Sequence, residues 1–463
     1  MQFFKAEKLL HGMGRLGEIP SEQKIFKTTF NIAWPSILES FLISLVGMVD
    51  TVMVSSLGSY AIAAVGLTTQ PKFIALAVFL SLNVAISAIV ARRRGEGDRE
   101  SANKVLMQAL AISVVLTVII SAASVVFADP IIHLCGSAPD THKDAVGYLR
   151  IIQGGMIFNV LSMVINAAQR GAGNTKIAMR TNIVSNGVNI VFNYLLIGGH
   201  FGFPKLGVQG AAIATVLGSI CACAMSIFSV LHPDQFICLR HHFTLSFDKR
   251  NISAIVNIGS STLAEQVFLR IGFLIYAILV AKLGTTAFAA HQIGMNIMNI
   301  SFSFGDGLSV AAIALVGRSL GEKRQDMAKI YGGVCQRMGV VFSLMLSIIC
   351  VVLGKPIFML FSREKAILNY GEMIMVLMAA ITFLQIAQVV FSGCLRGAGD
   401  TKFTAFVSLI SVTCIRPGLG YLFCYPLGLG LLGAWLGLAF DQLVRFFLTW
   451  LRFKSGKWTT YKV

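Results

Sequence analysis

Long apolar stretches dominate the chain, and they lack the strict alternation of polar and apolar residues expected of a membrane β-barrel strand. About 20 consecutive apolar residues let an α-helix cross the hydrocarbon core of a bilayer, where only helices and closed barrels satisfy their backbone hydrogen bonds. The pattern predicts an all-α integral membrane protein with twelve transmembrane helices. The expected spans are 28–56, 61–91, 105–127, 146–168, 177–198, 208–231, 253–281, 286–316, 328–353, 371–394, 403–424 and 430–451.

An internal repeat divides these helices into two sets of six. The residues RGAGNTK at 170–176 return as RGAGDTK at 396–402, and LGSYAIAA at 57–64 returns as LGTTAFAA at 283–290, both at an offset of 226 residues. Separated matches at one offset indicate a duplication. Because each half has six helices, both halves begin on the same side of the membrane. Parallel repeats of this kind are a known transporter arrangement.

The duplication predicts two six-helix lobes, with each copy of the seven-residue motif in a short cytoplasmic loop. Gly-Ala-Gly permits a tight turn, and Asn174 or Asp400 is expected to cap the helix that follows. The motif is interpreted either as a structural hairpin or as a hinge that moves when a lobe opens. The expected parts are a cytoplasmic arm (1–27), an N-lobe (28–231), a cytoplasmic linker (232–252), a C-lobe (253–451) and a cytoplasmic tail (452–463).

The distribution of Lys and Arg sets the expected orientation. With both termini inside, 26 of the 38 lie in inner segments, seven in outer segments and five within helices. This bias predicts cytoplasmic termini, and the net charge of +17 then reflects topology and contact with anionic lipids. Nucleic-acid binding is not expected, because the charges lie on seven separate short segments. The first 27 residues have no apolar core and are interpreted as an arm, not a signal peptide.

Several motifs together resemble the multidrug and toxic compound extrusion (MATE) family. They are the doubled RGAG[ND]TK, the twelve helices, VDT at 49–51 and AAHQI at 289–293. The resemblance runs from Phe26 to Trp458, and the ending RFKSGKW is similar to bacterial members. It implies a secondary exporter of organic cations in the bacterial inner membrane, driven by Na⁺ or H⁺. We expect no cofactor, no ATP site, no enzymatic activity and a functional monomer.

Other function classes fit the sequence less well. A lipid-linked precursor flippase of the same superfamily is the alternative, but its cleft would hold more basic residues for a pyrophosphate. A channel would need rings of charge or a repeated filter. The nine cysteines show no metal-ligand spacing. The 33 Phe and 18 Met include residues that could line a cleft for flat apolar cations.

Asp50 and an asparagine ladder form the predicted ion-coupling site. Helix 5 carries Asn182, Asn186, Asn189 and Asn193, whose spacing puts four amides on one face. Asn193 is expected at the depth of Asp50. Such an oxygen-rich site suits Na⁺, while the same carboxylate could carry H⁺ because desolvation disfavours its charged form. The alternative is that the amides only join helices by hydrogen bonds.

The family resemblance implies the same role for Asp50, Asn189 and Asn193, although some members have Asp in place of Asn193. We take these three, with Asn186, as the candidate Na⁺ or H⁺ site. Their counterparts in the second half, at the offset of 226, are apolar or aromatic: Tyr276, Ile415 and Leu419. The predicted cation site is therefore confined to the first lobe.

Other charged residues fall within predicted spans, where a carboxylate costs roughly 2.5–3.5 kcal/mol on insertion scales. Glu39 and Glu265 occur at equivalent positions of the two halves. With Arg270 they form the predicted substrate and proton pathway. The alternative is that Arg270 or Arg416 neutralises the two acids structurally.

Three further residues have structural expectations. Asp441 and its i+4 neighbour Arg445 are expected to pair on one face of helix 12. Asp306, between two glycines, is expected to cap or bend helix 8. His291 is expected to hydrogen-bond locally.

Overall fold

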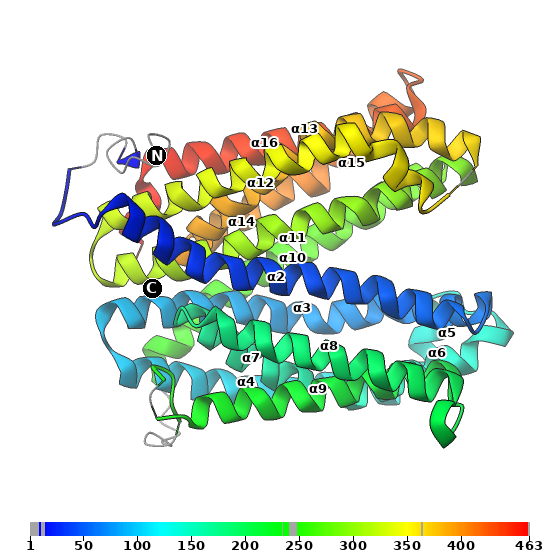
Figure 1. The fold of residues 1–463 in the computed structure, drawn as a ribbon, viewed down its shortest axis with the longest axis horizontal. Coiled ribbons are helices and arrows are strands. Elements are labelled where there is room, and N and C mark those ends of the chain that lie inside the picture. The colour runs from blue at the N-terminus through cyan, green and yellow to red at the C-terminus, as the bar shows by residue number, and fades with distance from the viewer. Residues whose placement is uncertain (1–8, 11–13, 234, 240–247, 363, 462–463) are drawn as a thin grey trace. The chain divides into compact units, whose positions relative to one another are not determined.

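The computed structural model describes residues 9–10, 14–233, 235–239, 248–362 and 364–461, and these ranges form helices and no β-strand (Figure 1). The first half contains α2 (Glu22–Ser55), α3 (Ser59–Glu96), α4 (Arg99–Val126), α5 (Ala128–Leu134), α6 (Pro139–Gly154), α7 (Met156–Gly171), α8 (Thr175–Gly198), the short η2 (His200–Gly202) and α9 (Gly207–Leu231). The second half contains α10 (Lys249–Ala281), α11 (Thr285–Gly321), α12 (Gln325–Met359), α13 (Lys365–Ala398), α14 (Thr401–Ser408), the π-helical η3 (Leu409–Ile415), α15 (Arg416–Cys424), α16 (Gly430–Ser455) and η4 (Lys457–Thr460).

Each of the twelve predicted spans corresponds to a helix or to a short series of helices. In the described part of the chain, ten helical segments are long and apolar enough to cross a membrane, and α6 with α7 forms an eleventh that is bent by 46°. The remaining predicted span is α8, whose 24 residues are long enough to cross. Its four asparagines lower its hydropathy. The all-α membrane fold is confirmed.

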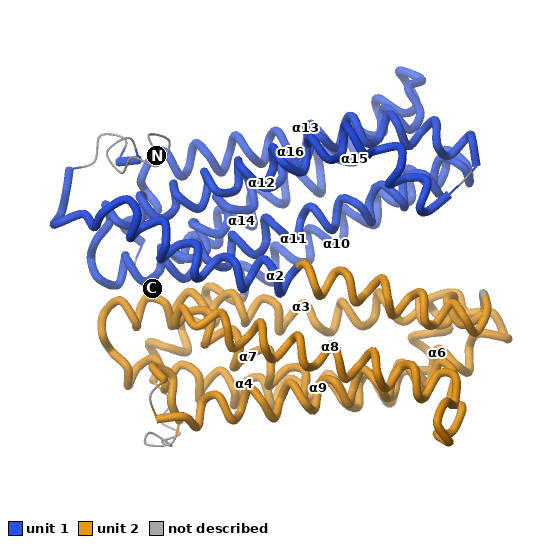
Figure 2. Tube along the Cα trace, in the orientation of Figure 1, with its two compact units in different colours: residues 1–40, 260–463 blue, residues 41–259 orange. Residues whose placement is uncertain are grey.

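The chain folds into two compact units, which Figure 2 shows in different colours. Unit 2 comprises Phe41–Gly259, and unit 1 comprises Met1–Ser40 together with Ser260–Val463. The division falls within α2 and within α10, so Asp50 belongs to unit 2 and Glu39 to unit 1. Of the predicted arm and linker, residues 1–8, 11–13, 234 and 240–247 lie outside the described residues.

The first glycine of each repeated motif lets two helices approach closely. A Cβ atom on Gly171 of α7 would collide with the backbone of Ser87 in α3, and one on Gly397 of α13 would lie 2.8 Å from the backbone of Ile313 in α11. Small residues serve this purpose where membrane helices pack. The second glycine of each motif has the positive φ that glycine tolerates: Gly173 at 75° and Gly399 at 88°. The predicted turn is confirmed.

The expectation that Asn174 and Asp400 cap the following helices is wrong, because neither side chain makes a capping hydrogen bond. Asn174 instead binds the segment that follows α9, and Asp400 binds the last turn of α16. Asn174 Nδ2 donates to Gln235 Oε1 at 2.7 Å, and Arg452 Nε donates to Asp400 Oδ2 at 2.7 Å. The motif therefore ties the fourth and fifth helical segments of each half to the end of the sixth.

The π-helical turn Leu409–Ile415 separates α14 from α15, whereas α8 is α-helical throughout. The backbone N–H of Arg416 donates to the carbonyl of Ser411, five residues earlier. Pro417 comes next, and its ring would collide with the carbonyl four residues before it in a regular α-helix. The wider π-turn relieves this conflict. A π-turn holds one residue more than an α-turn, so later residues are shifted by one relative to α8.

Candidate cation site

Asp50 of α2 meets two asparagines of α8 within unit 2. Asn193 Nδ2 donates to Asp50 Oδ1 at 2.8 Å and to Asn189 Oδ1 at 3.2 Å. Both asparagines are buried, with Asn193 only 1% exposed. The structure thus brings together Asp50, Asn189 and Asn193, three residues that the sequence assigned to one site on two different helices.

Thr215 of α9 completes this cluster. Its hydroxyl lies 3.1 Å from the side-chain amide of Asn189. A Cβ atom on Gly218, one turn further along α9, would lie 2.7 Å from the carbonyl oxygen of Ser185 in α8. This glycine therefore lets α9 approach α8 closely enough for the contact. Sequence reasoning missed Thr215 because a single hydroxyl in an apolar helix carries no periodic signal.

One buried oxygen of the cluster lacks a hydrogen-bond donor. Among the described residues, Asn193 Oδ1 has no hydrogen-bond partner. Asn189 Oδ1 lies 2.7 Å from Asp50 Oδ1, a contact between two acceptors unless the Asn189 amide is turned over so that its nitrogen donates. A buried acceptor without a donor is costly. A proton on Asp50 or a small hard cation among these oxygens would remove that cost, so the residues present fit either ion.

The other members of the ladder do not join the cluster. Asn182 Nδ2 donates to the carbonyl of Ala178 within its own helix at 3.1 Å. Asn186, which the sequence assigned to the site, has a buried Nδ2 with no hydrogen-bond partner in the part of the chain that the structure describes. Lys72 of α3 interacts electrostatically with Asp50, so a bound cation would share the carboxylate with an internal base.

Glu265 of α10 is buried and fully engaged within unit 1. Arg396 Nη2 lies 2.6 Å from Glu265 Oε1. The hydroxyls of Thr404 and Ser408 donate to the two carboxylate oxygens at 3.0 and 3.3 Å. The partner is thus the first residue of the repeated motif, and it is neither Arg270 nor Arg416. Sequence reasoning missed it because a contact across 131 residues leaves no local pattern.

The other two residues of the predicted pathway belong to the same unit. Glu39 is buried in the part of α2 that belongs to unit 1. Arg270 lies five residues after Glu265 on α10 and is partly buried. The Glu265 carboxylate is thus neutralised by Arg396 of α13.

Asp441 of α16 is buried between two bases. Arg416 donates to Asp441 Oδ2 from Nη2 at 2.6 Å and from Nε at 3.0 Å. Arg445 Nε lies 3.4 Å from Asp441 Oδ1. The predicted pair with Arg445 is confirmed, but Arg416 is the closer partner.

The expectations for Asp306 and His291 are corrected. The helix α11 continues through Asp306, whose carboxylate accepts a hydrogen bond from the Ser40 hydroxyl at 3.2 Å, so Asp306 caps no helix end. His291 Nδ1 has no hydrogen-bond partner among the described residues. Its ring instead packs edge-on against Tyr276 and Trp435, with centroids 5.5 and 5.8 Å away.

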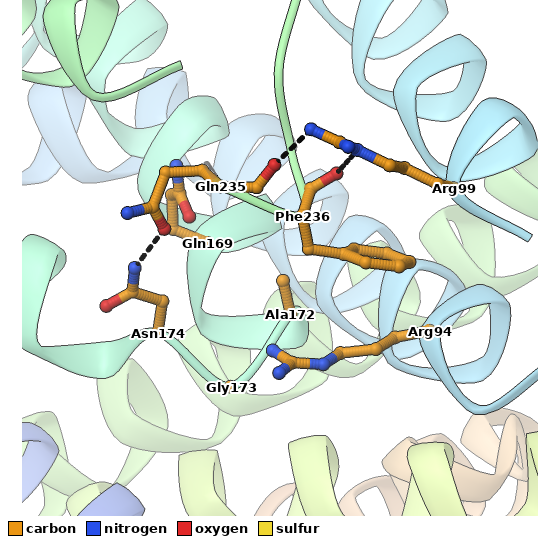
Figure 3. Close-up of a pocket in the computed structure, with 8 residues that line it drawn as sticks. All are labelled: Arg94, Arg99, Gln169, Ala172, Gly173, Asn174, Gln235 and Phe236. Carbon is orange, nitrogen blue, oxygen red and sulfur yellow. Dashed lines mark hydrogen bonds between the residues drawn. The ribbon is translucent and has the colours of Figure 1, made fainter. Parts of the chain in front are cut away.

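A polar pocket of about 470 Å³ opens in unit 2 beside the first copy of the motif (Figure 3). Arg99 donates to the carbonyls of Gln235 and Phe236 at 2.5 and 3.0 Å, and so holds the segment after α9 against the pocket. Asn174, which precedes α8, lies about 28 Å along that helix from Asn193 at 1.5 Å per residue. The pocket is lined by Arg94, Arg99, Gln169, Ala172, Gly173, Asn174, Gln235 and Phe236.

Comparison with known proteins gives consistent matches over the whole chain. The chain is 28% identical to the "Probable multidrug resistance protein NorM" of Thermotoga maritima over 446 residues, which cover 95% of each chain. It is 26% identical to the "Uncharacterized transporter YisQ" of Bacillus subtilis, over 94% of this chain and 98% of that protein.

Solved structures share the fold. "Outward-facing conformation of a multidrug resistance MATE family transporter of the MOP superfamily" superposes with a TM-score of 0.87 at 21% identity, covering 98% of this chain and 99% of the other. "Crystal structure of MATE in the bent conformation" gives 0.85 at 22% identity, with 98% of each chain covered. The family model MatE matches residues 35–195 and again residues 262–422. Since this match recurs in both halves and takes in most of the chain, the protein belongs to the multidrug and toxic compound extrusion family of membrane transporters.

Proposed function

We propose that this protein is a secondary antiporter that exports organic cations in exchange for Na⁺ or H⁺ bound at Asp50. The observation that carries this proposal is the cluster of Asp50, Asn189, Asn193 and Thr215, which sits among membrane-spanning helices and holds a buried amide oxygen without a hydrogen-bond partner among the described residues. A carboxylate within a membrane-spanning segment is a functional-site candidate by default.

The coupling follows from where the ion binds. The cluster joins α2, α8 and α9, so a bound cation would link three helices through their side-chain oxygens. An ion drives a two-state carrier only through its different affinity for the two states. We infer that the cluster binds the ion tightly in one state and that its release accompanies the change to the other.

The substrate class and the location rest on similarity and on charge. The NorM relatives are named as multidrug resistance proteins, which supports small organic cations as substrates here. The bias of Lys and Arg supports cytoplasmic termini, and the bacterial relatives support the plasma membrane. We propose that a single chain is the functional unit and that membrane lipids surround it.

The test is transport by the purified full chain in liposomes, with a fluorescent organic cation as substrate. A Na⁺ gradient and a pH gradient are imposed one at a time, without ATP. The proposal expects substrate movement with one of the two gradients, and Asp50→Asn should abolish that movement. The exposed Asp140 gives a matched control, because Asp140→Asn removes a carboxylate from the same unit outside the cluster.

Two results would overturn the proposal. The first is transport that needs ATP. The second is movement of a lipid-linked pyrophosphate, and not of the cation, under the same gradients, which would favour the flippase alternative.

A further inference from the structure

The π-turn changes which residues of the second half correspond to the cation site. After this turn, YLL at 194–196 aligns with YLF at 421–423, one residue beyond the constant offset. The counterpart of Asn189 is therefore Arg416, and it is not Ile415, the residue given by the offset of 226. An amide of the first half is replaced by a permanent cation in the second.

The remaining counterparts can be aligned in the same way. The counterpart of Asn193 is Gly420, one residue beyond the offset of 226. In the last helix of each half, LGVQG at 206–210 aligns with LGLLG at 429–433. This alignment makes Asp441 the counterpart of Gly218, the glycine that lets α9 approach α8.

Arg416 lies against the counterpart of Asp50. That counterpart is Tyr276, since α2 and α10 keep the offset of 226. The Arg416 guanidinium lies 5.6 Å from the Tyr276 ring centroid and 5.0 Å from that of Phe273. Aromatic faces attract cations at such distances. Where α2 carries the carboxylate of Asp50, α10 of the second half carries the aromatic ring of Tyr276. The carboxylate of the second half comes from Asp441 on α16.

The ion pair between Arg416 and Asp441 is buried. The Arg416 side chain is 1% exposed, and that of Asp441 is 0% exposed. Two guanidinium nitrogens donate to one carboxylate oxygen, while Arg416 Nη1 has no hydrogen-bond partner among the residues that the structure describes. Arg445 is a second base near Asp441, at 3.4 Å, but it lies on the same helix as Asp441. Only Arg416 crosses from one helix to another at the counterpart position.

We propose that Arg416 is a tethered cation that permanently fills the second-half counterpart of the cation site. The mobile cation of the first half has a covalently attached equivalent here, so the second half needs no ion from solution. One consequence rests on the proposed function: each transport cycle uses a single coupling ion, which binds at Asp50.

Guanidinium rescue tests the tethered cation directly. Arg416→Ala in the purified full chain should lower the thermal unfolding midpoint by about 3–5 °C, because it breaks a buried ion pair. Guanidinium chloride at about 10 mM, far below the molar concentrations that unfold proteins, should restore most of that loss. Urea, a neutral molecule of nearly the same shape, should restore none of it.

Arg445→Ala is the matched control, because it removes the other base near Asp441 but not the counterpart of Asn189. Guanidinium should leave its midpoint and that of the wild type unchanged. An Arg416→Ala protein of normal stability would overturn the proposal. Equal rescue by urea, or equal rescue of Arg445→Ala, would also overturn it.

A second pair of variants covers the case in which Arg416→Ala does not fold. Arg416→Lys keeps a positive charge, whereas Arg416→Gln keeps a shorter polar side chain without charge. The proposal expects the lysine variant to unfold several degrees above the glutamine variant. Equal midpoints would contradict a role for the charge.

The number of coupling ions is measured separately. In liposomes, the opposing substrate gradient that halts transport gives the ratio of ions to substrate. The proposal expects one ion per cycle, and a ratio of two would overturn this consequence. If no ion gradient drives transport, the proposed antiport fails, while the guanidinium result still decides whether Arg416 is a tethered cation.

Discussion

The carboxylate of Glu265 in α10 lies 2.6 Å from the guanidinium of Arg396, the first residue of the second RGAG motif. The Glu265 side chain is 4% exposed and that of Arg396 is 18% exposed. Two hydroxyls also donate to the carboxylate, so three groups of unit 1 hold this acid in place. The pair fastens the motif to α10, which favours a structural role for Glu265 over a direct one in the pathway.

Glu265→Gln is therefore expected to destabilise the protein. The amide keeps the shape but leaves the Arg396 charge buried without its partner, a change that costs about 3–5 kcal/mol for buried pairs. Thermal unfolding in detergent measures the loss. Glu322→Gln is the control, since Glu322 pairs with Arg318 on the surface and such pairs contribute about 0–1 kcal/mol.

A transport assay of the Glu265→Gln variant separates a structural role of Glu265 from a role in the substrate pathway. A structural anchor predicts equal losses for cationic and neutral substrates. A selective loss of the cationic substrate, at unchanged stability, would return Glu265 to the substrate pathway.

Asp50→Asn is expected to abolish coupling and to leave the fold intact. The amide is nearly isosteric with the carboxylate, and the hydrogen bond from Asn193 can be kept. Without the charge, Na⁺ would meet only neutral oxygens and a proton would have no carboxylate to bind. Substrate binding in detergent should persist while gradient-driven efflux in liposomes falls to background. Efflux near the wild-type rate would show that Asp50 is not the coupling residue.

Asn193→Asp is expected to strengthen cation binding. It replaces Nδ2, which donates to Asp50, with an oxygen, and so puts a second carboxylate within reach of Asp50. Two adjacent carboxylates bind a shared proton or cation more tightly than one. The apparent affinity for the coupling ion should rise about tenfold or more, for about 1.4 kcal/mol of added attraction. Unchanged or weaker affinity would place the ion elsewhere.

The features that sequence predicted are those with local or repeated signals. Helical spans follow from runs of apolar residues, and the duplication follows from matched stretches at one offset. Asp50, Asn189 and Asn193 could be brought together because helical periodicity fixed the face of α8, and distance from the membrane surface fixed their common depth. The same helical spacing also assigned Asn186 to the site, however, and the structure does not bring Asn186 to the other three residues.

The features that sequence did not predict depend on packing between distant segments. Thr215 reaches Asn189 only because Gly218 admits the neighbouring helix. Arg416 was not recognised as the counterpart of Asn189, because counting at a constant offset cannot register the extra residue of a π-turn. That turn follows from Pro417, whose effect on the helix could be suspected from the sequence but not located.

The two copies of the motif differ at one residue, Asn174 in the first and Asp400 in the second. Exchanging the amide and the acid should destabilise the protein at Asp400 more than at Asn174. Asp400 is 1% exposed and pairs with Arg452 at 2.7 Å, so Asp400→Asn leaves a guanidinium facing a neutral amide. Losing a charged hydrogen bond of this kind costs about 1.5–3 kcal/mol. The reciprocal change Asn174→Asp meets Gln235, whose amide can turn to donate to the new carboxylate. We expect thermal unfolding to show a clear loss for Asp400→Asn and a change within about 1 kcal/mol for Asn174→Asp. Equal losses would show that the two residues serve the turn itself, and not the different segments they bind.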